Sequence, residues 1–308
     1  MTSYSSLDEL SVHDAWLTIG IFDGVHRGHQ EILHRLVAGA RQAGAPAVVL
    51  TFHPHPAVVL GGKTDFKALS TPEERIELLE SFGVDLVVKQ TFDQAFANQT
   101  AADFMQRISR TLGLKCLVLG YDSALGRGRE GNAARLTEIG QELGFAVQVV
   151  PPVADERGIL SSTRIRAAIA AGRVDAAAAD LGRNYSVSGP VVHGDGRGHR
   201  INFPTANIQV PDGKILPANG IYACWAWVDG KKIPAATNVG VRPTFTPDLP
   251  APTVEAYLLD FGRDIYGKEI KLEFVDYLRP EERYDSVQDL LDQIALDVLD
   301  CRKILMVK

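Results

Sequence analysis

The pattern of apolar residues changes once along this chain, and the change divides it into two parts. Up to about residue 150, short apolar runs alternate with stretches that have helical periodicity. After residue 184, short β-type runs follow one another with turns between them. Strands that alternate with helices form a parallel sheet covered on both faces, so the first part predicts an α/β domain. The second part predicts a small β-barrel.

The first part contains five apolar runs that we expect to be buried strands: residues 17–22, 47–52, 84–89, 115–120 and 146–150. The expected helices between them are residues 28–43, 72–81, 101–112 and 132–143. In the first helix, Ile32, Leu33 and Leu36 share one face at helical spacing. Two more helices are expected after the Pro151-Pro152 pair, at residues 162–171 and 174–181.

The second part has five runs with strand character: residues 185–193, 220–228, 231–239, 253–259 and 269–277. Asp229 and Gly230 lie between two of them and predict a tight hairpin turn. An amphipathic helix over residues 286–304 is expected to close the chain. Gly182 is a typical helix stop, so we place the domain boundary next to it. The predicted domains are residues 1–183 and 184–308.

Composition excludes several classes of protein. The 308 residues are 45% hydrophobic and 23% charged, which is ordinary for a globular protein of two domains. The net charge is -6 and no basic stripe is present, which argues against a nucleic-acid partner. The three cysteines lie far apart, so neither a zinc site nor a disulfide framework is indicated. We expect them to be reduced.

Targeting signals are also missing from the pattern. The polar, acidic first 16 residues lack the basic start and apolar stretch of a signal peptide. No apolar run approaches the roughly 20 residues that cross a bilayer. The sequence therefore predicts a soluble, cytoplasmic protein with no membrane partner.

The junction between the first strand and the first helix is the first candidate site. Ligands of open parallel sheets bind beyond the carboxyl ends of the strands, and this junction lies at such an end. Gly24 and Gly28 allow the backbone to turn and to approach a ligand closely. Next to them, His26 and His29 can donate hydrogen bonds to phosphate, with help from the helix dipole. One histidine there is usually a cap or a surface residue, but the pair after a Phe-Asp-Gly turn is more specific.

Three other segments could belong to the same site. Ser162 is a candidate helix cap, which would direct Thr163 and Arg166 toward an anion. The alternative is a capped helix with an exposed arginine. The prolines around His55 fix a bend after the second strand, where a flavin or nucleotide could sit. Asp122 begins a glycine-rich loop after the fourth strand. Alone, each of these loops is more often a plain connection than a site.

The second part carries its own candidate site. Residues 189–198 include four glycines, whose backbone amides could wrap around phosphates, although a mobile surface turn is the alternative. Thr205 and Asn207 offer the oxygen ligands that Mg²⁺ prefers. Glu255 is a carboxylate within an apolar strand, and as a general base it could deprotonate a primary hydroxyl that attacks the γ-phosphate of ATP. An outward-facing strand residue is the alternative.

These motifs resemble known families. His26-Arg-Gly-His29 resembles the HxGH signature of nucleotidylyltransferases, and Ser161–Arg166 resembles their element for ATP phosphates. The glycine-rich loop, Pro204-Thr-Ala-Asn207 and the run from Val254 to Phe261 resemble the riboflavin kinase module. The segments at residues 238–245 and 276–285 are similar as well. From about Leu17 to Ile304, the chain resembles the prokaryotic bifunctional riboflavin kinase/FAD synthetase family.

The resemblance implies a Rossmann-like nucleotidylyltransferase domain, then a six-stranded Greek-key barrel with a terminal helix. It implies that His26 and His29 stabilise adenylyl transfer to FMN and that Glu255 is the kinase base. The implied ATP-binding residues are Gly20, Phe22, Gly24, Gly28, Ser162, Thr163, Arg166, Gly194, Gly196, Gly198 and Thr205. The implied flavin-binding residues are His55, Pro56, Asp122 and Arg279, and the Mg²⁺ ligands are Thr205 and Asn207. ATP, riboflavin and FMN would be the small-molecule partners of a monomer or weak homo-oligomer.

Two positions depart from the family pattern. The family usually has Asp-Phe-Arg-Phe-Gly where this chain has Asp122-Ser-Ala-Leu-Gly126, and Asn202 replaces a glycine before the Pro-Thr-Ala-Asn motif. The first departure keeps open a riboflavin kinase whose adenylyltransferase domain is weakened or silent. A flavin-binding sensor without turnover and a nucleotidylyltransferase for another acceptor are further alternatives.

Overall fold

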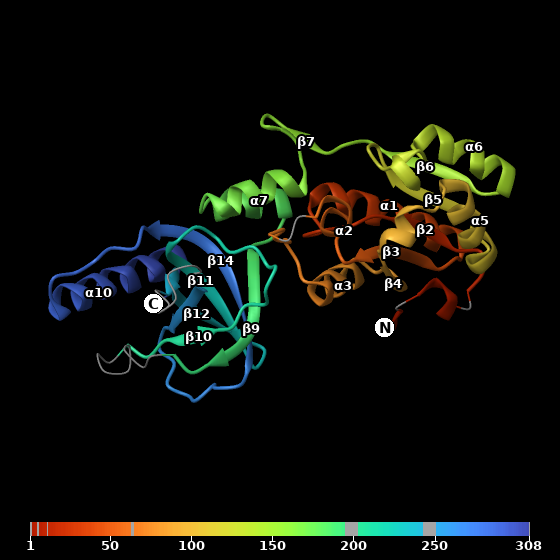
Figure 1. Cartoon of the computed structure of the whole chain (residues 1–308). Helices are drawn as coiled ribbons and strands as arrows, with labels where there is room; N and C mark the ends of the chain where they lie inside the picture. The colour runs from red at the N-terminus through yellow and green to blue at the C-terminus, as the bar shows by residue number, and fades with distance from the viewer. Residues whose placement is uncertain are drawn as a thin grey trace. The chain divides into compact units, whose positions relative to one another are not determined.

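The structure is a computed structural model that describes residues 2–4, 6–10, 12–62, 65–194, 203–242 and 251–307. Its contacts divide the chain into two compact units, Met1–Ser162 and Thr163–Lys308 (Figure 1). Each unit is described by itself.

The first unit is built on a six-stranded parallel sheet in the order β1-β4-β3-β2-β5-β6 (Figure 1). Its strands are β1 (Thr2–Tyr4), β2 (Trp16–Ile19), β3 (Ala47–His53), β4 (Leu86–Thr91), β5 (Cys116–Gly120) and β6 (Ala146–Val150). Five of them correspond to the predicted runs. The exception is β1, which lies in the polar N-terminal segment, where no apolar pattern indicates a strand.

Helices cover both faces of this sheet, as predicted. They are α1 (Arg27–Ala43), α2 (Pro56–Gly61), α3 (Pro72–Ser81), α4 (Gln94–Ala97), α5 (Ala101–Leu112) and α6 (Ala133–Leu143), with short 3-10 turns η1 (Leu7–Glu9) and η2 (Arg127–Arg129). One core joins α1 and α3 to the sheet through Leu36, Leu79 and Val49. The other joins α5 and α6 to the opposite face, with Met105 and Ile139 buried. Each buried leucine contributes about 1.5–3 kcal/mol, so these two cores fix the sheet that carries the site.

The position of β2 explains where the first site lies. In the sheet, β2 has β3 on one side and β5 on the other, so the strand order reverses at β2. Ligands of open α/β sheets bind at such a switch point, beyond the carboxyl ends of the strands. The segment from Gly20 to His26 leaves β2 there and leads directly into α1.

The second unit is a closed six-stranded antiparallel barrel in the order β10-β13-β12-β11-β14-β9. Its strands are β9 (Tyr185–Val192), β10 (Ala206–Ile208), β11 (Gly220–Val228), β12 (Lys231–Arg242), β13 (Ala251–Leu258) and β14 (Glu269–Arg279). The helices α7 (Ser162–Ala170) and α8 (Val174–Leu181) come before it, and α10 (Val287–Ile304) follows it. The predicted fold class is confirmed.

Local features of the barrel agree with the sequence except at β10. Asp229 and Gly230 both have positive φ, 49° and 74°, as a tight hairpin turn requires. The strand β10 has only three residues, too few to show an alternating pattern, and the sequence did not indicate it. Without β10 the barrel would not close, because it pairs with both β9 and β13.

The predicted boundary near residue 183 stays a prediction. The contacts divide the chain after Ser162, and α8 packs against β9 and β14 of the barrel. All three cysteines are free and buried. Within the described ranges, no helix is long and apolar enough to cross a membrane.

Candidate functional sites

His26 and His29 meet at the start of α1. His26 is the N-cap residue, and its Nδ1 accepts a hydrogen bond from the backbone N–H of His29 at 3.4 Å. The two imidazole rings stack with their centroids 3.7 Å apart and their planes 19° apart. The Phe22 ring packs against His29 edge-on, at 5.2 Å between centroids. The structure therefore brings the predicted histidine pair together at a helix N-terminus.

A strained turn delivers these rings to their position. Phe22 is buried and has a φ of 53°, which a residue with a side chain rarely adopts. Gly24 has a φ of 76°, and a Cβ there would lie 2.8 Å from the Leu69 side chain. Only glycine fits that position. The small Gly20 and Gly28 likewise face the rings of Phe22 and His26, at 3.0 and 3.1 Å from an added Cβ.

Asp23 fastens the turn to the segment before α3. Its buried carboxylate accepts hydrogen bonds from the backbone N–H groups of Leu69 at 2.9 Å and Ser70 at 3.1 Å. The Ser70 hydroxyl also accepts from the Gly24 N–H at 3.0 Å. Sequence reasoning did not assign a role to Asp23, although the acidic residue beside Gly24 was a visible signal. These hydrogen bonds of Asp23 hold the turn between β2 and α1 in a fixed conformation before any substrate binds.

The environment keeps His29 neutral. Removal from water lowers the pKa of His29 well below its usual value, and the nearby His26 and Arg75 lower it further. Its buried Nδ1 has no hydrogen-bond partner among the described residues. A neutral imidazole at a helix N-terminus can serve as a hydrogen-bond donor without carrying its own charge.

Ser162 reaches the same turn. Its hydroxyl donates a 2.9 Å hydrogen bond to the carbonyl oxygen of Asp23. The helix α7 begins at Ser162 itself, so Ser162 is its first residue and not, as predicted, the cap before it. Thr163 and Arg166 belong to the second unit, and their contact with phosphate stays a prediction.

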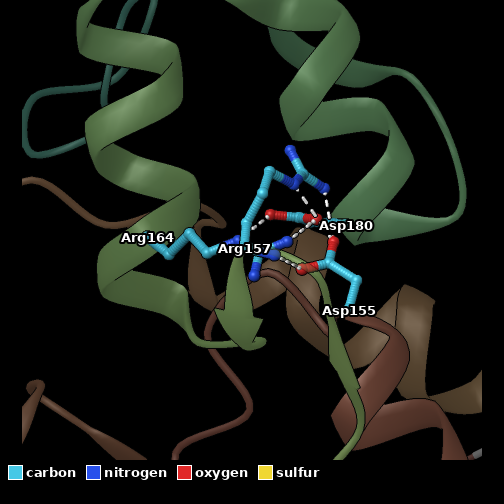
Figure 2. A network of polar contacts seen from close by, with 4 residues as sticks. All are labelled: Asp155, Arg157, Arg164 and Asp180. Carbon is cyan, nitrogen blue, oxygen red and sulfur yellow. Dashed lines mark hydrogen bonds and ion pairs between the residues drawn. The ribbon is translucent and has the colours of Figure 1, made fainter.

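Ion pairs lie on either side of Ser162 (Figure 2). In the second unit, Arg164 on α7 binds both carboxylate oxygens of Asp180 on α8, at 2.8 and 2.6 Å. The carboxylate side chain is only 3% exposed, so the pair fixes the direction of α7. In the first unit, Arg157 binds Asp155 at 3.1 and 2.7 Å across the hairpin of β7 (Ala154–Asp155) and β8 (Gly158–Ile159). The sequence alone predicts neither of these two ion pairs.

The second site crosses three neighbouring strands of the barrel. Glu255 on β13 lies opposite Asn207 on β10 and opposite Asn238 on β12. Residues directly opposite each other in a sheet point to the same face, so the three side chains form a row. The Thr205 hydroxyl donates to a Glu255 carboxylate oxygen at 3.4 Å. Three of the predicted kinase residues, Thr205, Asn207 and Glu255, therefore lie together.

Gly194 and Asn238 complete what the structure describes of this site. An added Cβ at Gly194 would lie 2.7 Å from the Asn207 amide oxygen, so the loop after β9 needs a glycine there. The Asn238 amide donates to Glu281 at 3.0 Å. Asn238 begins a motif that resembles the family, but its spacing gave no reason to assign it a role. Gly196, Gly198, Asn202 and residues 243–250 lie outside the described residues.

Comparison with known proteins covers both units. The FAD synthetase family matches residues 9–164, and the riboflavin kinase family matches residues 181–305. The bifunctional riboflavin kinase/FMN adenylyltransferase of Listeria monocytogenes is 34% identical over 296 residues, which cover 96% of this chain and 94% of that protein. This chain belongs to the bifunctional riboflavin kinase/FMN adenylyltransferase family.

Other relatives agree with this membership. The Escherichia coli K12 protein of the same name is 36% identical over 289 residues, which cover 93% of this chain and 91% of that protein. A crystal structure described as a macrolide-efflux protein from Streptococcus pneumoniae superposes with a TM-score of 0.90 at 33% identity. It covers 98% of each chain, so the fold described above extends over that whole protein.

The flavin-binding residues implied by the family have defined partners. The His55 ring caps α2 by accepting from the Ala57 N–H at 3.0 Å, and it stacks on Phe66 at 4.1 Å. Pro56 is the first residue of the same helix. Both oxygens of Asp297 bind Arg279, at 2.8 and 2.7 Å, and this pairing raises the pKa of Arg279. A contact of any of these residues with flavin stays a prediction.

The loop that begins at Asp122 lacks the aromatic residues of the family but is held in place by hydrogen bonds. Leu125 and Gly131 exchange backbone hydrogen bonds of 3.0 and 2.9 Å. Glu130 accepts from the Ala101 N–H at 2.9 Å, which ties the loop to the start of α5. Arg129 donates to the backbone oxygen of Asp122 at 3.0 Å. The backbone of the loop is therefore held without an aromatic side chain between residues 122 and 126.

Proposed function

We propose that this chain makes FMN and FAD in succession at two separate sites. The barrel unit would transfer the γ-phosphoryl group of ATP to riboflavin. The first unit would transfer AMP from a second ATP to FMN and release pyrophosphate. The observation that carries this proposal is that each unit contains its own set of reactive side chains, within the span that matches the corresponding family.

In the first unit, His26 and His29 would act on the α-phosphate of ATP. The FMN phosphate attacks this phosphorus, and negative charge grows on its oxygens in the transition state. Imidazole N–H groups and the N-terminus of α1 are donors that stabilise such charge. The strained turn holds them in advance, so little reorganisation is needed. Gly20, Phe22, Gly24 and Gly28 would shape the surface that receives the phosphates.

In the second unit, Glu255 would accept the proton of the riboflavin primary hydroxyl as it attacks the γ-phosphate. Thr205, Asn207 and Glu255 supply hard oxygen atoms, which is the donor set that Mg²⁺ prefers, and Thr205 already lies 3.4 Å from the carboxylate. Thr205 and Asn207 would hold this ion. Bound there, Mg²⁺ would offset the negative charge of the ATP phosphates. Gly194 would let the loop after β9 approach them.

The remaining assignments follow the family. Ser162, Thr163 and Arg166 would bind ATP phosphates for adenylyl transfer. His55, Pro56 and Asp122 would bind the flavin of FMN, and Arg279 would help to bind riboflavin. We expect a monomer or weak homo-oligomer that works in the cytoplasm without nucleic acid.

A second candidate is a riboflavin kinase with a weakened or silent adenylyltransferase unit. The observation that favours it is the loop Asp122–Gly126, which has Ser, Ala and Leu where the family has aromatic residues. An FMN ring would lose their contacts there.

Product analysis of the wild-type protein decides between the two. Purified protein is incubated with Mg²⁺-ATP and either riboflavin or FMN, and flavins and pyrophosphate are quantified over time. The first candidate predicts FMN and then FAD from riboflavin, with one pyrophosphate for each FAD. FMN without FAD, from either substrate, would support the second candidate. Unchanged riboflavin would contradict both.

A further inference from the structure

Arg75 is a buried cation for which neither the sequence nor the family supplied a role. It lies in the first turns of α3, and only 3% of the residue is exposed. No carboxylate forms an ion pair with it among the described residues, and its Nε has no hydrogen-bond partner there. Arginines this deeply buried are nearly always paired, because an unpaired charge in the interior is costly. Arg75 therefore needs an explanation beyond packing.

Hydrogen bonds connect Arg75 to the histidine site. Its NH1 donates to the Phe52 carbonyl oxygen at 3.1 Å and to the Thr51 hydroxyl at 3.3 Å, both at the carboxyl end of β3. The Thr51 hydroxyl donates in turn to the Ile21 carbonyl oxygen at 2.9 Å. Ile21 precedes Phe22, whose ring packs against His29. The guanidinium of Arg75 is thus connected through Thr51 on β3 to the residue that precedes Phe22 in the strained turn.

The charge of Arg75 also acts on His29 and His53. Together with removal from water and His26, Arg75 lowers the pKa of His29. Removal from water lowers the pKa of His53, Lys89 and Arg75 lower it further, and Glu73 raises it. Asp23 and Glu73 are the carboxylates that act on Arg75 itself, and burial still lowers its pKa overall.

We propose that Arg75 is a positioning residue of the first site, which braces the turn that carries Phe22 and supplies a fixed positive charge near His29 for a phosphate of the substrate. This proposal rests on the proposed adenylyl transfer. Both ATP and FMN bring phosphates, and either could provide the balancing negative charge. Because Arg75 is buried, its charge acts more strongly than one at a hydrated surface.

Two substitutions separate the brace from the charge. Arg75→Met removes the charge and the hydrogen bonds but keeps a side chain that fits a buried space. Arg75→Lys keeps a charge but cannot make the same pair of hydrogen bonds to Thr51 and Phe52. Arg35→Met is the matched control, because Arg35 lies on α1 after His29 and is exposed and paired with Glu31. Loss of an exposed charge is screened by solvent and should not affect the site.

The first readout is the titration of His29 in substrate-free protein, followed by NMR of the histidine ring protons and assigned with His29→Gln. Arg75→Met should raise the pKa of His29, because it removes a positive charge that disfavours protonation of the imidazole. Arg75→Lys and Arg35→Met should leave it near the wild-type value. This readout does not require that the chain make FAD, so it remains valid if the proposed function fails.

The second readout is the pH profile of FMN adenylylation, with riboflavin kinase activity of the same samples as the folding control. Arg75→Met should shift the acidic limb upward with His29 and reduce kcat/KM about tenfold or more. Arg75→Lys should leave the acidic limb at its wild-type pH and should lower kcat/KM by less than Arg75→Met does. A rise in KM for ATP alone would identify the nucleotide as the source of the phosphate, and a rise for FMN alone would identify the flavin.

Two results would overturn the proposal. One is that Arg75→Met changes neither the pKa of His29 nor the position of the acidic limb in the pH profile. The other is a lysine variant that shifts both as far as the methionine variant, because the retained positive charge would then have no effect on His29. If Arg75→Met does not fold, the lysine variant alone decides, by whether His29 keeps its wild-type titration.

Discussion

The two sites of this chain are built in opposite ways. In the first unit, one continuous stretch from Gly20 to His29 supplies the turn, the helix cap and both imidazoles. In the barrel, Asn207, Asn238 and Glu255 come from three strands and meet only through register. A local site depends on backbone geometry in one turn, whereas a register-built site depends on closure of the whole barrel. The two should therefore fail separately and for different reasons.

The largest effect is expected at Glu255. Glu255→Gln keeps the shape of the side chain but removes the proposed base, so FMN formation from riboflavin should fall by about 10²–10⁴-fold. Adenylylation of supplied FMN should stay near wild type, because that site lies in the other unit. Glu269→Gln is the control, since Glu269 is an exposed carboxylate at the start of β14. Equal loss of both activities would contradict the separation of the sites.

The mirror experiment is His29→Ala. Loss of one preorganised donor to the transition state should reduce FAD formation from FMN by about 10²–10³-fold and spare the kinase. The control is His34→Ala, an exposed histidine farther along α1. If FAD formation survives in His29→Ala, His29 has no part in adenylyl transfer.

A smaller effect is expected from Gly194→Ala. The new methyl group would collide with the Asn207 amide and displace it from the row beside Glu255. We expect the kinase KM for ATP to rise about tenfold, which corresponds to roughly 1.4 kcal/mol of binding. Gly262→Ala is the matched control, because nothing lies within 4 Å of a Cβ there. Identical kinetics of the two variants would remove Gly194 from the site.

The smallest effect concerns pH. The pKa of His29 is lowered in the folded state, so the unfolded chain binds more protons just below pH 6.5. Stability of the first unit is therefore full above about pH 7 and falls as the pH drops below the unfolded pKa, by at most about 1.4 kcal/mol per pH unit for one proton. Urea unfolding at pH 7.5 and 5.5 measures this slope. His29→Gln should flatten it, and a slope that stays the same would show that His29 titrates normally.

The contrast between the sites also explains what the sequence could predict. The helices α3 and α5 were predicted to the residue because their signals are local: Thr71 and Glu74 form a capping box, and Thr100 caps α5. The histidine pair was equally local. The short strands β1 and β10 escaped prediction, because three residues are too few to show periodicity.

Residues whose importance comes from distant partners could not be found in this way. Asp23 acts on Leu69 and Ser70, and Arg75 acts on Thr51 and Phe52, more than 20 residues away. The row of Asn207, Glu255 and Asn238 depends on register, which no linear pattern displays. Glu255 was still suspected from sequence, because a carboxylate among apolar strand residues is conspicuous by itself.

Complementation between two inactivated proteins tests the central claim most directly. His29→Ala and Glu255→Gln are each incubated with riboflavin and Mg²⁺-ATP, alone and as an equimolar mixture, and FAD is quantified. The account predicts FMN without FAD from the first variant, neither product from the second, and FAD from the mixture as free FMN passes between molecules. A mixture that accumulates FMN and never makes FAD would contradict two independent sites in one chain.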